Sequence, residues 1–361
     1  MIGSLRAFSC NTRDEWSRSL QTGAAARRTP FARGAVGWLA YEAGAWFELM
    51  PRPVTPPTLP LAWWGHVAAW ARFDRHGRRV AGNAPLASTA APAARPPEGR
   101  LVERPDPRQF TEGVRAVLDH LRRGDAYQVN LSRRLVVSHP GDPLDAWLRL
   151  RALNPARRAM LIETPGGAVV SNSPELLLRQ RGAQLLSVPI KGTAPVGASR
   201  QALLASPKER AELTMIVDLV RADLGRVAAT GTVRAGPRRV GRVGHLWHAM
   251  QRVHARLDDG RDTIDAIAAL FPPGSVTGAP KVRAMELIRA LEPVPRGVYC
   301  GSLGWLGPGG CELNVAIRTI QFVGREAHVH VGAGIVIGSD PERELLETEV
   351  KAERMLQALL A

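Results

Sequence analysis

Residues 187–193 read SVPIKGT, and Lys191 within them is the residue around which the other motifs can be arranged. The β-rich apolar run from Leu185 to Ile190 predicts a strand that ends by directing the Lys191 ammonium towards a cleft. Lysine is rare in this chain, since only four of its 48 basic residues are lysines. A buried lysine can become a neutral amine and act as a nucleophile, which an arginine cannot do. The alternative is an ordinary solvated lysine at the end of a strand.

The composition limits the size of the core and the class of protein. With 361 residues and 45% hydrophobic residues, the chain can form a large core and two or three domains. The net charge of +15 and the pI near 11 would suit a nucleic-acid-binding protein. The arginines are dispersed, however, and no run of five basic residues occurs, so a general bias towards arginine explains the charge better.

The cysteines and the N-terminal sequence indicate in which cellular compartment the protein is expected. Cys10, Cys300 and Cys311 have no metal-binding spacing, and so few cysteines are typical of a reducing compartment. The N-terminus lacks a signal-peptide pattern, and no apolar run approaches the roughly 18 residues of a membrane helix. These features predict a cytoplasmic protein without a membrane or nucleic-acid partner.

Composition also divides the chain. Residues 86–105 are rich in Ala and Pro and have no periodic pattern, which predicts a linker. Residues 1–85 are then a short accessory region, in which residues 61–73 are expected to form a pair of strands. Residues 106–361 are expected to form the catalytic core.

Periodicity gives the elements of this core. Helices are predicted at residues 106–121, 142–153, 263–270, 281–291 and 340–360, and another begins at the N-cap Ser206. Strands are predicted at residues 127–132, in a hairpin of 159–162 with 168–171, and at 298–306, 313–322 and 327–337. The run 240–253 gives no clear assignment.

Two pairs of glutamates lie three residues apart on predicted helices. Glu209 and Glu212 form the first pair, and Glu344 and Glu347 form the second, with Lys351 one turn later. Residues at i and i+3 share a helix face, so two facing pairs would give an all-oxygen site suited to Mg²⁺. The alternative is a capping box at Glu209 and a solvated ion-pair stripe on the second helix. The residues alone leave both interpretations open.

Several single residues could also belong to a site. Glu175 follows Ser-Pro after a predicted strand, and it could act as a general acid if burial raised its pKa. Arg318 lies in an apolar run, where its charge needs a counter-ion from the protein or from a substrate. The bare backbone of residues 332–334, Gly-Ala-Gly, could receive an anion. Three histidines without metal-binding spacing are interpreted as structural: His245, His248 and His254.

Together, ten ordered motifs resemble those of the chorismate-utilising enzymes, a family that includes anthranilate, aminodeoxychorismate, isochorismate and salicylate synthases. The motifs are GDAYQVNLSRRL (124–135), SPE (173–175), PIKGTAP (189–195), ERAELTMIVDLVRADLGRV (209–227), GHLW (244–247), GSVTGAPKVRAMELI (274–288), CGSLGW (300–305), NVAIRT (314–319), VGAGIV (331–336) and ELLETEVKA (344–352). The resemblance implies an α+β fold of two packed, mostly antiparallel sheets with outer helices.

Within this family, the segments YQVNLSRR and PIKGT resemble the component I subunits of aminodeoxychorismate synthase. Anthranilate synthases typically carry alanine at the position of Lys191. Their component I remains the alternative within the family, because His245 matches a histidine linked to pyruvate elimination. A basic nucleic-acid-binding protein is the alternative of another class.

The resemblance implies a role for each candidate residue. Lys191 would attack C2 of chorismate while the C4 hydroxyl leaves, and ammonia would then attack C4 and release the lysine. Glu175 would be the acid for the departing hydroxyl. A Mg²⁺ ion on Glu212 and Glu347, backed by Glu209 and Glu344, would neutralise one substrate carboxylate. The residues implied for the other carboxylate are Arg318, Gly332, Ala333, Gly334 and Lys351, with Ser275 and Thr277 near by.

The resemblance also implies a partner. The chain has no GxCxGxQ motif of a glutaminase, so a separate glutamine amidotransferase subunit is expected to supply ammonia. The product, 4-amino-4-deoxychorismate, would lead to p-aminobenzoate and folate. No LLES-type segment is found, so tryptophan binding is not expected.

Overall fold

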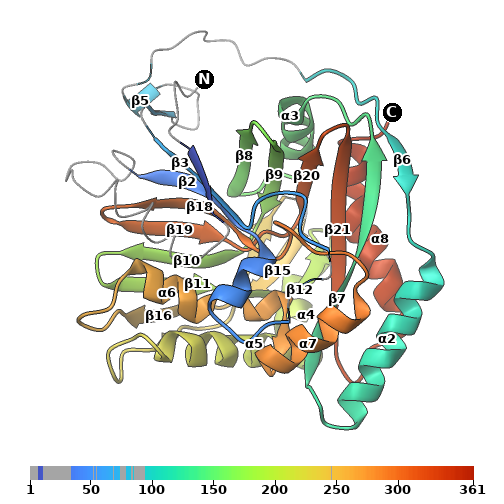
Figure 1. The fold of residues 1–361 in the computed structure, drawn as a ribbon. Helices are drawn as coiled ribbons and strands as arrows, with labels where there is room; N and C mark the ends of the chain where they lie inside the picture. The colour runs from blue at the N-terminus through green and yellow to red at the C-terminus, as the bar shows by residue number, and fades with distance from the viewer. Residues whose placement is uncertain are drawn as a thin grey trace.

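The computed structural model describes residues 7–10, 34–51, 53, 55–67, 69–73, 79–82, 84, 94–244 and 246–361. Two large sheets dominate this part of the chain (Figure 1). The first has nine strands in the order β1 (Ala7–Cys10), β3 (Ala62–His66), β2 (Ala35–Leu39), β18 (Ser302–Gly307), β19 (Gly310–Asn314), β10 (Leu176–Arg181), β11 (Gln184–Val188), β16 (Val253–Arg256) and β13 (Arg234–Ala235).

The second large sheet is also antiparallel throughout. Its strands are, in order, β17 (Gly278–Ala279), β7 (Gln128–Ser138), β21 (Glu326–Ile335), β20 (Thr319–Val323), β9 (Gly167–Ser173) and β8 (Arg158–Thr164), with β6 (Arg100–Glu103) paired to β7. The predicted hairpin is confirmed, because β8 and β9 pair from Thr164 opposite Gly167 outwards.

The two sheets pack face to face through apolar side chains. Trp38 on β2 stacks on Trp63 on β3, with ring centroids 5.3 Å apart. In the same buried cluster lie Val169 on β9 and Leu303 on β18, so both sheets contribute to it. Burying one such side chain contributes about 1.5–3 kcal/mol, which makes this layer a main source of stability. The expected fold of two packed antiparallel sheets is therefore confirmed.

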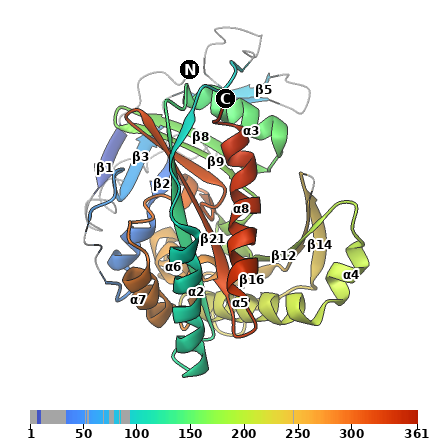
Figure 2. The ribbon, with the colours of Figure 1, turned by 90° about the vertical axis from the view of Figure 1, so that its right-hand side faces the viewer.

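Helices cover the outer faces of the sheets (Figure 2). Helices α8 (Pro341–Gln357) and α3 (Pro143–Leu153) cover the second sheet, where Leu150 and Met355 join Val170 and Ile320 in a buried cluster. Helix α2 (Pro107–Arg122) lies beside α8. Helices α5 (Pro207–Gly225) and α6 (Thr263–Leu270) pack against the first sheet, and α7 (Lys281–Leu291) packs against β7.

Local signals explain why these helices were predictable. A side chain caps the N-terminus of each of four of them, and a proline occupies the first helical turn: Asp106, Asp142, Ser206 and Asp340 are the caps. A cap satisfies backbone N–H groups, and proline has no N–H to leave unsatisfied.

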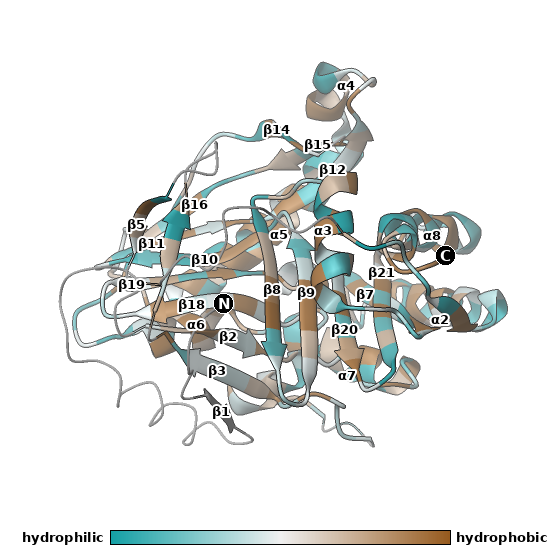
Figure 3. Ribbon diagram, turned by 90° about the horizontal axis from the view of Figure 1, so that it is seen from above, coloured by the Kyte–Doolittle hydropathy of each residue, from teal (hydrophilic) through white to brown (hydrophobic). Residues whose placement is uncertain are grey.

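A small third sheet stands at one end of the molecule. It contains β12 (Ile190–Pro195), β15 (Leu246–Met250) and β14 (Arg239–Val243), next to the short helix α4 (Arg200–Ala205) (Figure 3). The run 240–253, which the sequence left unassigned, is thus mainly the hairpin β14–β15. Lys191 lies in β12.

The N-terminal strands complete the first sheet, because β2 pairs with β18 of the catalytic region. The division at residues 86–105 remains a prediction. The expected strand pair within residues 61–73 was wrong: β3 pairs with β1 and β2, whereas β4 (Ala71–Phe73) pairs with β5 (Arg79–Gly82).

The predicted strand 313–322 was also wrong. Strand β19 ends at Asn314 in the first sheet, and β20 begins at Thr319 in the second. The chain crosses between the sheets at residues 315–318, where Arg318 has φ +52°. Arg318 is therefore in the crossing and not in a strand.

Two further observations concern the described residues as a whole. None of their helices combines the length and the hydropathy required to cross a bilayer. Cys300 and Cys311 are buried free thiols.

Candidate active site

Lys191 lies at a β-bulge in β12, and its side chain reaches β21 of the second sheet. Lys191 pairs with Ala249 and Thr193 pairs with His248, so Gly192 is an extra residue in β12. Gly192 has φ +75°, the left-handed conformation that suits glycine at a bulge. A Cβ atom added to Gly334 on β21 would lie 3.0 Å from Lys191 Nζ. The amine therefore lies directly against the backbone of Gly334.

The surroundings of Lys191 favour a neutral amine. Burial lowers the pKa of Lys191 below that of a solvated lysine. The Glu212 carboxylate acts in the opposite direction, and the Lys351 ammonium lowers the pKa further. This position does not fit the alternative of a solvated lysine at a strand end.

Glu175 is a buried carboxyl group close to Lys191. It lies between β9 and β10 and is only 4% exposed. Burial raises its pKa to about 7, although hydrogen bonds from Ser275 and the Ile190 N–H and the charge of Lys191 partly oppose the shift. A carboxyl group with this pKa can donate a proton near neutral pH.

The two glutamate pairs, on α5 and α8, lie close enough for charges on one helix to affect carboxyl groups on the other. Burial raises the pKa of Glu212, Lys191 acts against this shift, and the charges of Glu209 and Glu347 add to it. Burial likewise raises the pKa of Glu344, and the charge of Glu347 adds to the shift. Carboxylates from both helices therefore share one electrostatic environment.

The four glutamates suit a divalent cation, because a cation would offset the repulsion between their partly buried carboxylates. Among the described residues, no three acidic, histidine or cysteine side chains converge as metal ligands. Mg²⁺ needs only one or two carboxylates and retains waters, so Glu212 and Glu347 would be the residues to hold it. The contacts expected for a cap and for an ion-pair stripe are also present. Ser206 Oγ accepts a hydrogen bond from the N–H of Glu209, and Lys351 Nζ pairs with Glu347 at 2.6 Å.

Arg318 is a partly buried cation. Burial lowers its pKa to about 10. Its Nη2 donates to His248 Nε2 at 3.4 Å, and its buried Nη1 has no hydrogen-bond partner in the described part of the chain. A guanidinium in this state fits an anionic ligand such as a carboxylate.

The Gly-Ala-Gly segment of residues 332–334 lies inside β21, within the predicted strand of residues 327–337. Gly332 and Gly334 pair with Ser132 and Asn130 of β7, and Lys351 Nζ donates to the Gly332 carbonyl at 2.9 Å. A Cβ at Gly332 would lie 2.6 Å from the Leu131 carbonyl oxygen, so glycine allows close packing there. Ala333, between the two glycines, is fully buried in the core.

Ser275 and Thr277, the two loop residues expected near a substrate carboxylate, have different surroundings. Ser275 hydrogen-bonds to the Glu175 carboxylate. Thr277 is fully buried and donates from Oγ1 to the Pro273 carbonyl at 3.0 Å, so it holds the loop together. His245 lies outside the described residues.

Sequence reasoning missed Arg296. This residue is 1% exposed and its guanidinium ion-pairs with Glu292 at 2.6 Å. It also donates to the carbonyls of Val276 and Asn130, and so attaches the loop that carries Ser275 to β7. Only the tertiary structure shows this, because the surrounding sequence has no periodic signal.

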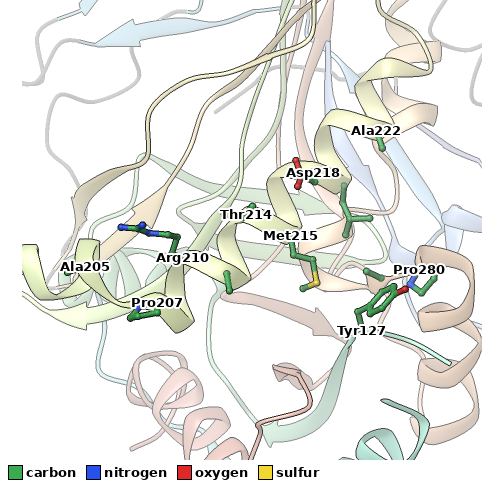
Figure 4. A pocket seen from close by; sticks show the side chains of 12 residues that line it. Tyr127, Ala205, Pro207, Arg210, Thr214, Met215, Asp218, Ala222 and Pro280 are labelled. Carbon is green, nitrogen blue, oxygen red and sulfur yellow. The ribbon is translucent and has the colours of Figure 1, made fainter. Parts of the chain in front are cut away.

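A pocket of the described structure lies along α5 (Figure 4). Its volume is about 940 Å³, and its lining includes Tyr127, Met215, Asp218 and Pro280. Lys191 and the four glutamates are not among the lining residues. The candidate catalytic residues are instead those around Lys191.

These features agree with the comparisons with known proteins. The family of chorismate binding enzymes matches residues 2–357. The chain belongs to the chorismate-binding enzyme family. It is therefore an enzyme that acts on chorismate, and the nucleic-acid-binding alternative is set aside.

Relatives within the chorismate-binding family have two names. The chain is 37% identical to anthranilate synthase component 1 1 of Haloarcula marismortui and 39% identical to anthranilate synthase component 1 of Streptomyces coelicolor, over 91% of this chain and 76% and 73% of those proteins. It is 40% identical to aminodeoxychorismate synthase component 1 of Bacillus subtilis, over 69% of this chain and 55% of that protein.

Solved structures agree on the fold. Anthranilate synthase component I of Streptococcus pneumoniae matches with a TM-score of 0.83 at 25% identity, over 98% of this chain and 93% of that chain. The menaquinone-specific isochorismate synthase of Escherichia coli matches with a TM-score of 0.79 at 20% identity, over 99% and 86% of the two chains.

The bulge provides a first prediction. Gly192→Ala should destabilise the protein by about 1–2 kcal/mol through its left-handed backbone. It should also lower kcat/KM at least about tenfold, because the new Cβ would collide with the Glu209 carboxylate and shift Lys191. Thermal unfolding and steady-state kinetics with chorismate measure the two effects.

Gly182→Ala is the matched control. Gly182 has φ +54°, and a Cβ there meets no atom within 4 Å. This variant should lose comparable stability but retain activity. Equal activity of both variants would contradict the role assigned to the bulge.

Proposed function

We propose that the protein is the component I subunit of aminodeoxychorismate synthase. It would convert chorismate and ammonia to 4-amino-4-deoxychorismate. The observation that carries this proposal is the position of the Lys191 amine, with a lowered pKa, beside Glu175 and against Gly334. A nucleophilic amine is needed only if the enzyme forms a covalent intermediate.

The residues suit a two-step substitution. Lys191 attacks C2 of chorismate, the ring double bonds shift, and the C4 hydroxyl leaves with the proton of Glu175. Ammonia then attacks C4, the double bonds return, and the C2–N bond to Lys191 breaks. The Glu175 carboxylate would then recover a proton from the new ammonium group.

Charge neutralisation completes the proposed site. In the described part of the chain, the buried Nη1 of Arg318 has no hydrogen-bond partner, so it would hold one substrate carboxylate. Lys351 is anchored at the Gly332 carbonyl. Mg²⁺, when bound by Glu212 and Glu347, would neutralise the negative charge of the other carboxylate.

Anthranilate synthase component I is the second candidate. The observation in its favour is the name of the relatives that match 91% of this chain. The two candidates differ in product, since anthranilate formation also eliminates pyruvate.

Product identification separates these candidates. The purified chain should be incubated with chorismate, Mg²⁺ and an ammonium salt, and the product identified by chromatography with and without an aminodeoxychorismate lyase. We expect p-aminobenzoate only when the lyase is present. Fluorescent anthranilate without the lyase would overturn the proposal. Glutamine should not replace ammonium unless a glutaminase subunit is added, and turnover of glutamine by the chain alone would contradict that partner.

The magnesium proposal has its own prediction. Glu212→Gln and Glu347→Gln should each raise the Mg²⁺ concentration needed for half-maximal activity by about 10–100-fold, because each removes a charged oxygen ligand. The shift of the unfolding temperature with Mg²⁺ alone should shrink in parallel.

Glu342→Gln is the control on the same helix. Glu342 is exposed and pairs with Arg115 across α2 and α8. If the Glu212 and Glu347 variants behaved like this control, the glutamates would be only a cap and an ion-pair stripe.

A further inference from the structure

Arg296 is a buried arginine that the proposed mechanism does not use. It is 1% exposed, and its guanidinium donates to the Glu292 carboxylate from Nε at 2.8 Å and from Nη2 at 2.6 Å. The carbon at the centre of the guanidinium lies over the Tyr41 ring, 4.6 Å from the ring centroid. Because Glu292 balances its charge within the protein, Arg296 needs no substrate as a counter-ion.

The remaining contacts of the guanidinium join two distant segments. Nη1 donates to the Val276 carbonyl at 2.8 Å, and Nη2 donates to the Asn130 carbonyl at 2.6 Å. Val276 belongs to the turn of residues 274–277, and Asn130 belongs to β7. The Asn130 N–H donates in turn to the Thr277 carbonyl at 2.8 Å. Arg296 therefore fastens the turn to β7.

This part of β7 has an open edge that side chains complete. Strand β17 pairs with β7 at residues 128–129 and β6 pairs with it at residues 136–138. In the described part of the chain, no strand pairs with this edge between those two stretches. There, the Ser132 N–H donates to Glu292 Oε1 at 2.7 Å, and Arg296 donates to the Asn130 carbonyl. Glu292 and Arg296 thus supply the acceptor and the donor that a neighbouring strand would provide.

The turn carries a residue that contacts the proposed acid. Ser275 directly precedes Val276 and hydrogen-bonds to the Glu175 carboxylate. Both Ser275 and Glu175 line one small buried cavity. The Val276 carbonyl that Arg296 holds is in the next peptide unit, so the place of the Ser275 hydroxyl depends on this hydrogen bond.

The other charged groups around Glu175 lie on different elements. Lys191 on β12 and Arg158 on β8 both lower its pKa by their charge, whereas burial raises it. Asp223 on α5 lines the same cavity and is paired with Lys281 at 2.9 Å. A replacement of Arg296 leaves all of these groups in the chain. A change in the titration of Glu175 would therefore report its contact with the turn.

We infer that Arg296 is a positioning residue, whose guanidinium holds the turn of residues 274–277 on β7 so that Ser275 keeps its hydrogen bond to Glu175. This inference deepens the proposed function, because it rests on Glu175 as the general acid. A hydrogen bond donated to a carboxylate favours the charged form. Loss of the Ser275 bond should therefore raise the pKa of Glu175 above its value in the wild-type protein.

Arg296→Lys tests this role. The lysine retains a positive charge beside Glu292, but a single ammonium nitrogen cannot replace the planar fork that reaches two carbonyls and a carboxylate. We expect the fall of kcat with rising pH to move up by about one pH unit, while the KM for chorismate changes less than about threefold. The infrared C=O band of protonated Glu175 should titrate with the same shift in the absence of substrate. Subtracting the spectrum of the same protein with Glu175→Gln isolates this band.

Two further variants separate positioning from a general loss of packing. Ser275→Ala removes the hydrogen bond itself and should give the same shift, and in this background Arg296→Lys should add less than about 0.3 pH unit. Arg133→Met is the matched control, because Arg133 is a buried arginine of β7 that donates to Thr348 on α8. It should lower the unfolding temperature but leave the titration of Glu175 unchanged. The spectral subtraction also removes Glu42, whose pKa burial raises to about 7.

Three outcomes would overturn the inference: an unmoved Glu175 band in Arg296→Lys, a full additional shift in the Ser275→Ala background, or an equal shift in Arg133→Met. If Arg296→Lys does not fold, Glu292→Gln takes its place. The amide nitrogen cannot accept from the guanidinium, so the Glu175 band should move in the same direction, and an unmoved band would again contradict the role of Arg296.

Failure of the proposed function has a different result. A kcat that does not follow the Glu175 band would remove the general acid, and anthranilate in the product assay would change the product. In both cases the shift of the band in Arg296→Lys would still show that Arg296 positions the turn.

Discussion

Lys191→Ala should abolish formation of 4-amino-4-deoxychorismate, with a loss of kcat of at least about 10³-fold. The reason is that no other amine lies against Gly334 in the part of the chain that the structure describes, so nothing replaces the nucleophile. Lys191→Arg should be equally inactive. Arginine retains the positive charge but cannot become a neutral amine. The measurement is the rate of p-aminobenzoate formation in the assay coupled to the lyase.

The arginine variant distinguishes two roles of the lysine. If Lys191 served only as a positive charge for a substrate carboxylate, Lys191→Arg would retain substantial activity. Lys191→Ala alone cannot make this distinction, because both roles predict a loss. A Lys191→Arg enzyme with more than about a tenth of the wild-type rate would therefore remove the nucleophile from the mechanism.

Intact mass gives an independent measurement. Without ammonia, the wild-type chain incubated with chorismate should gain the mass of chorismate less one water, because the C4 hydroxyl has left and nothing has displaced the lysine. Peptide mapping should place the adduct on Lys191 and not on the exposed Lys208 of α5. Addition of ammonium should release the adduct as product.

The parts of the site that depend on local geometry could be predicted from the sequence. A helix places residues at i and i+3 on one face whatever surrounds it, so the pairing of Glu209 with Glu212 followed from spacing alone. Caps and prolines at Ser206 and Asp340 likewise gave the starts of α5 and α8, because capping uses residues within one turn.

The contacts between strands could not be predicted in the same way. Lys191 reaches Gly334, and His248 reaches Arg318, through pairings between segments far apart in the chain. The run 313–322 looked like one strand because both of its halves are apolar, whereas the crossing between sheets is marked only by backbone angles at Arg318. Strand register depends on the partner strand, and a single sequence contains no direct signal for it.

Glu175→Gln should lower kcat by about 10²–10⁴-fold and remove one limb of the pH profile. In the wild-type enzyme, burial raises the pKa of Glu175 to about 7, so the carboxyl group is protonated below this pH and loses its proton above it. As a general acid it acts in the protonated form. The wild-type rate should therefore fall as the pH rises through about 7, and the residual rate of Glu175→Gln should not follow this curve. A variant with the wild-type profile would exclude Glu175 as the acid.

The same pKa predicts that the stability of the fold also falls as the pH rises. In the unfolded chain Glu175 titrates at its ordinary value near 4.5, and in the folded chain it titrates at about 7. Its protonated form therefore favours the fold fully below pH 4.5, and this contribution is lost as the pH rises through 7. At pH 8 the buried carboxylate should cost on the order of 3 kcal/mol in the free energy of unfolding.

Glu175→Gln should thus be more stable than wild type at pH 8 while being far less active. At pH 5 the difference in stability should be small. Burial also raises the pKa of Glu42 to about 7, so only the difference between wild type and variant isolates Glu175. Glu163→Gln, at an exposed position on β8, is the control and should show neither effect. A buried carboxyl group that ionises near pH 7 lowers the stability of the protein above this pH. If Glu175→Gln and wild type were equally stable from pH 5 to pH 8, burial would not raise the pKa of Glu175.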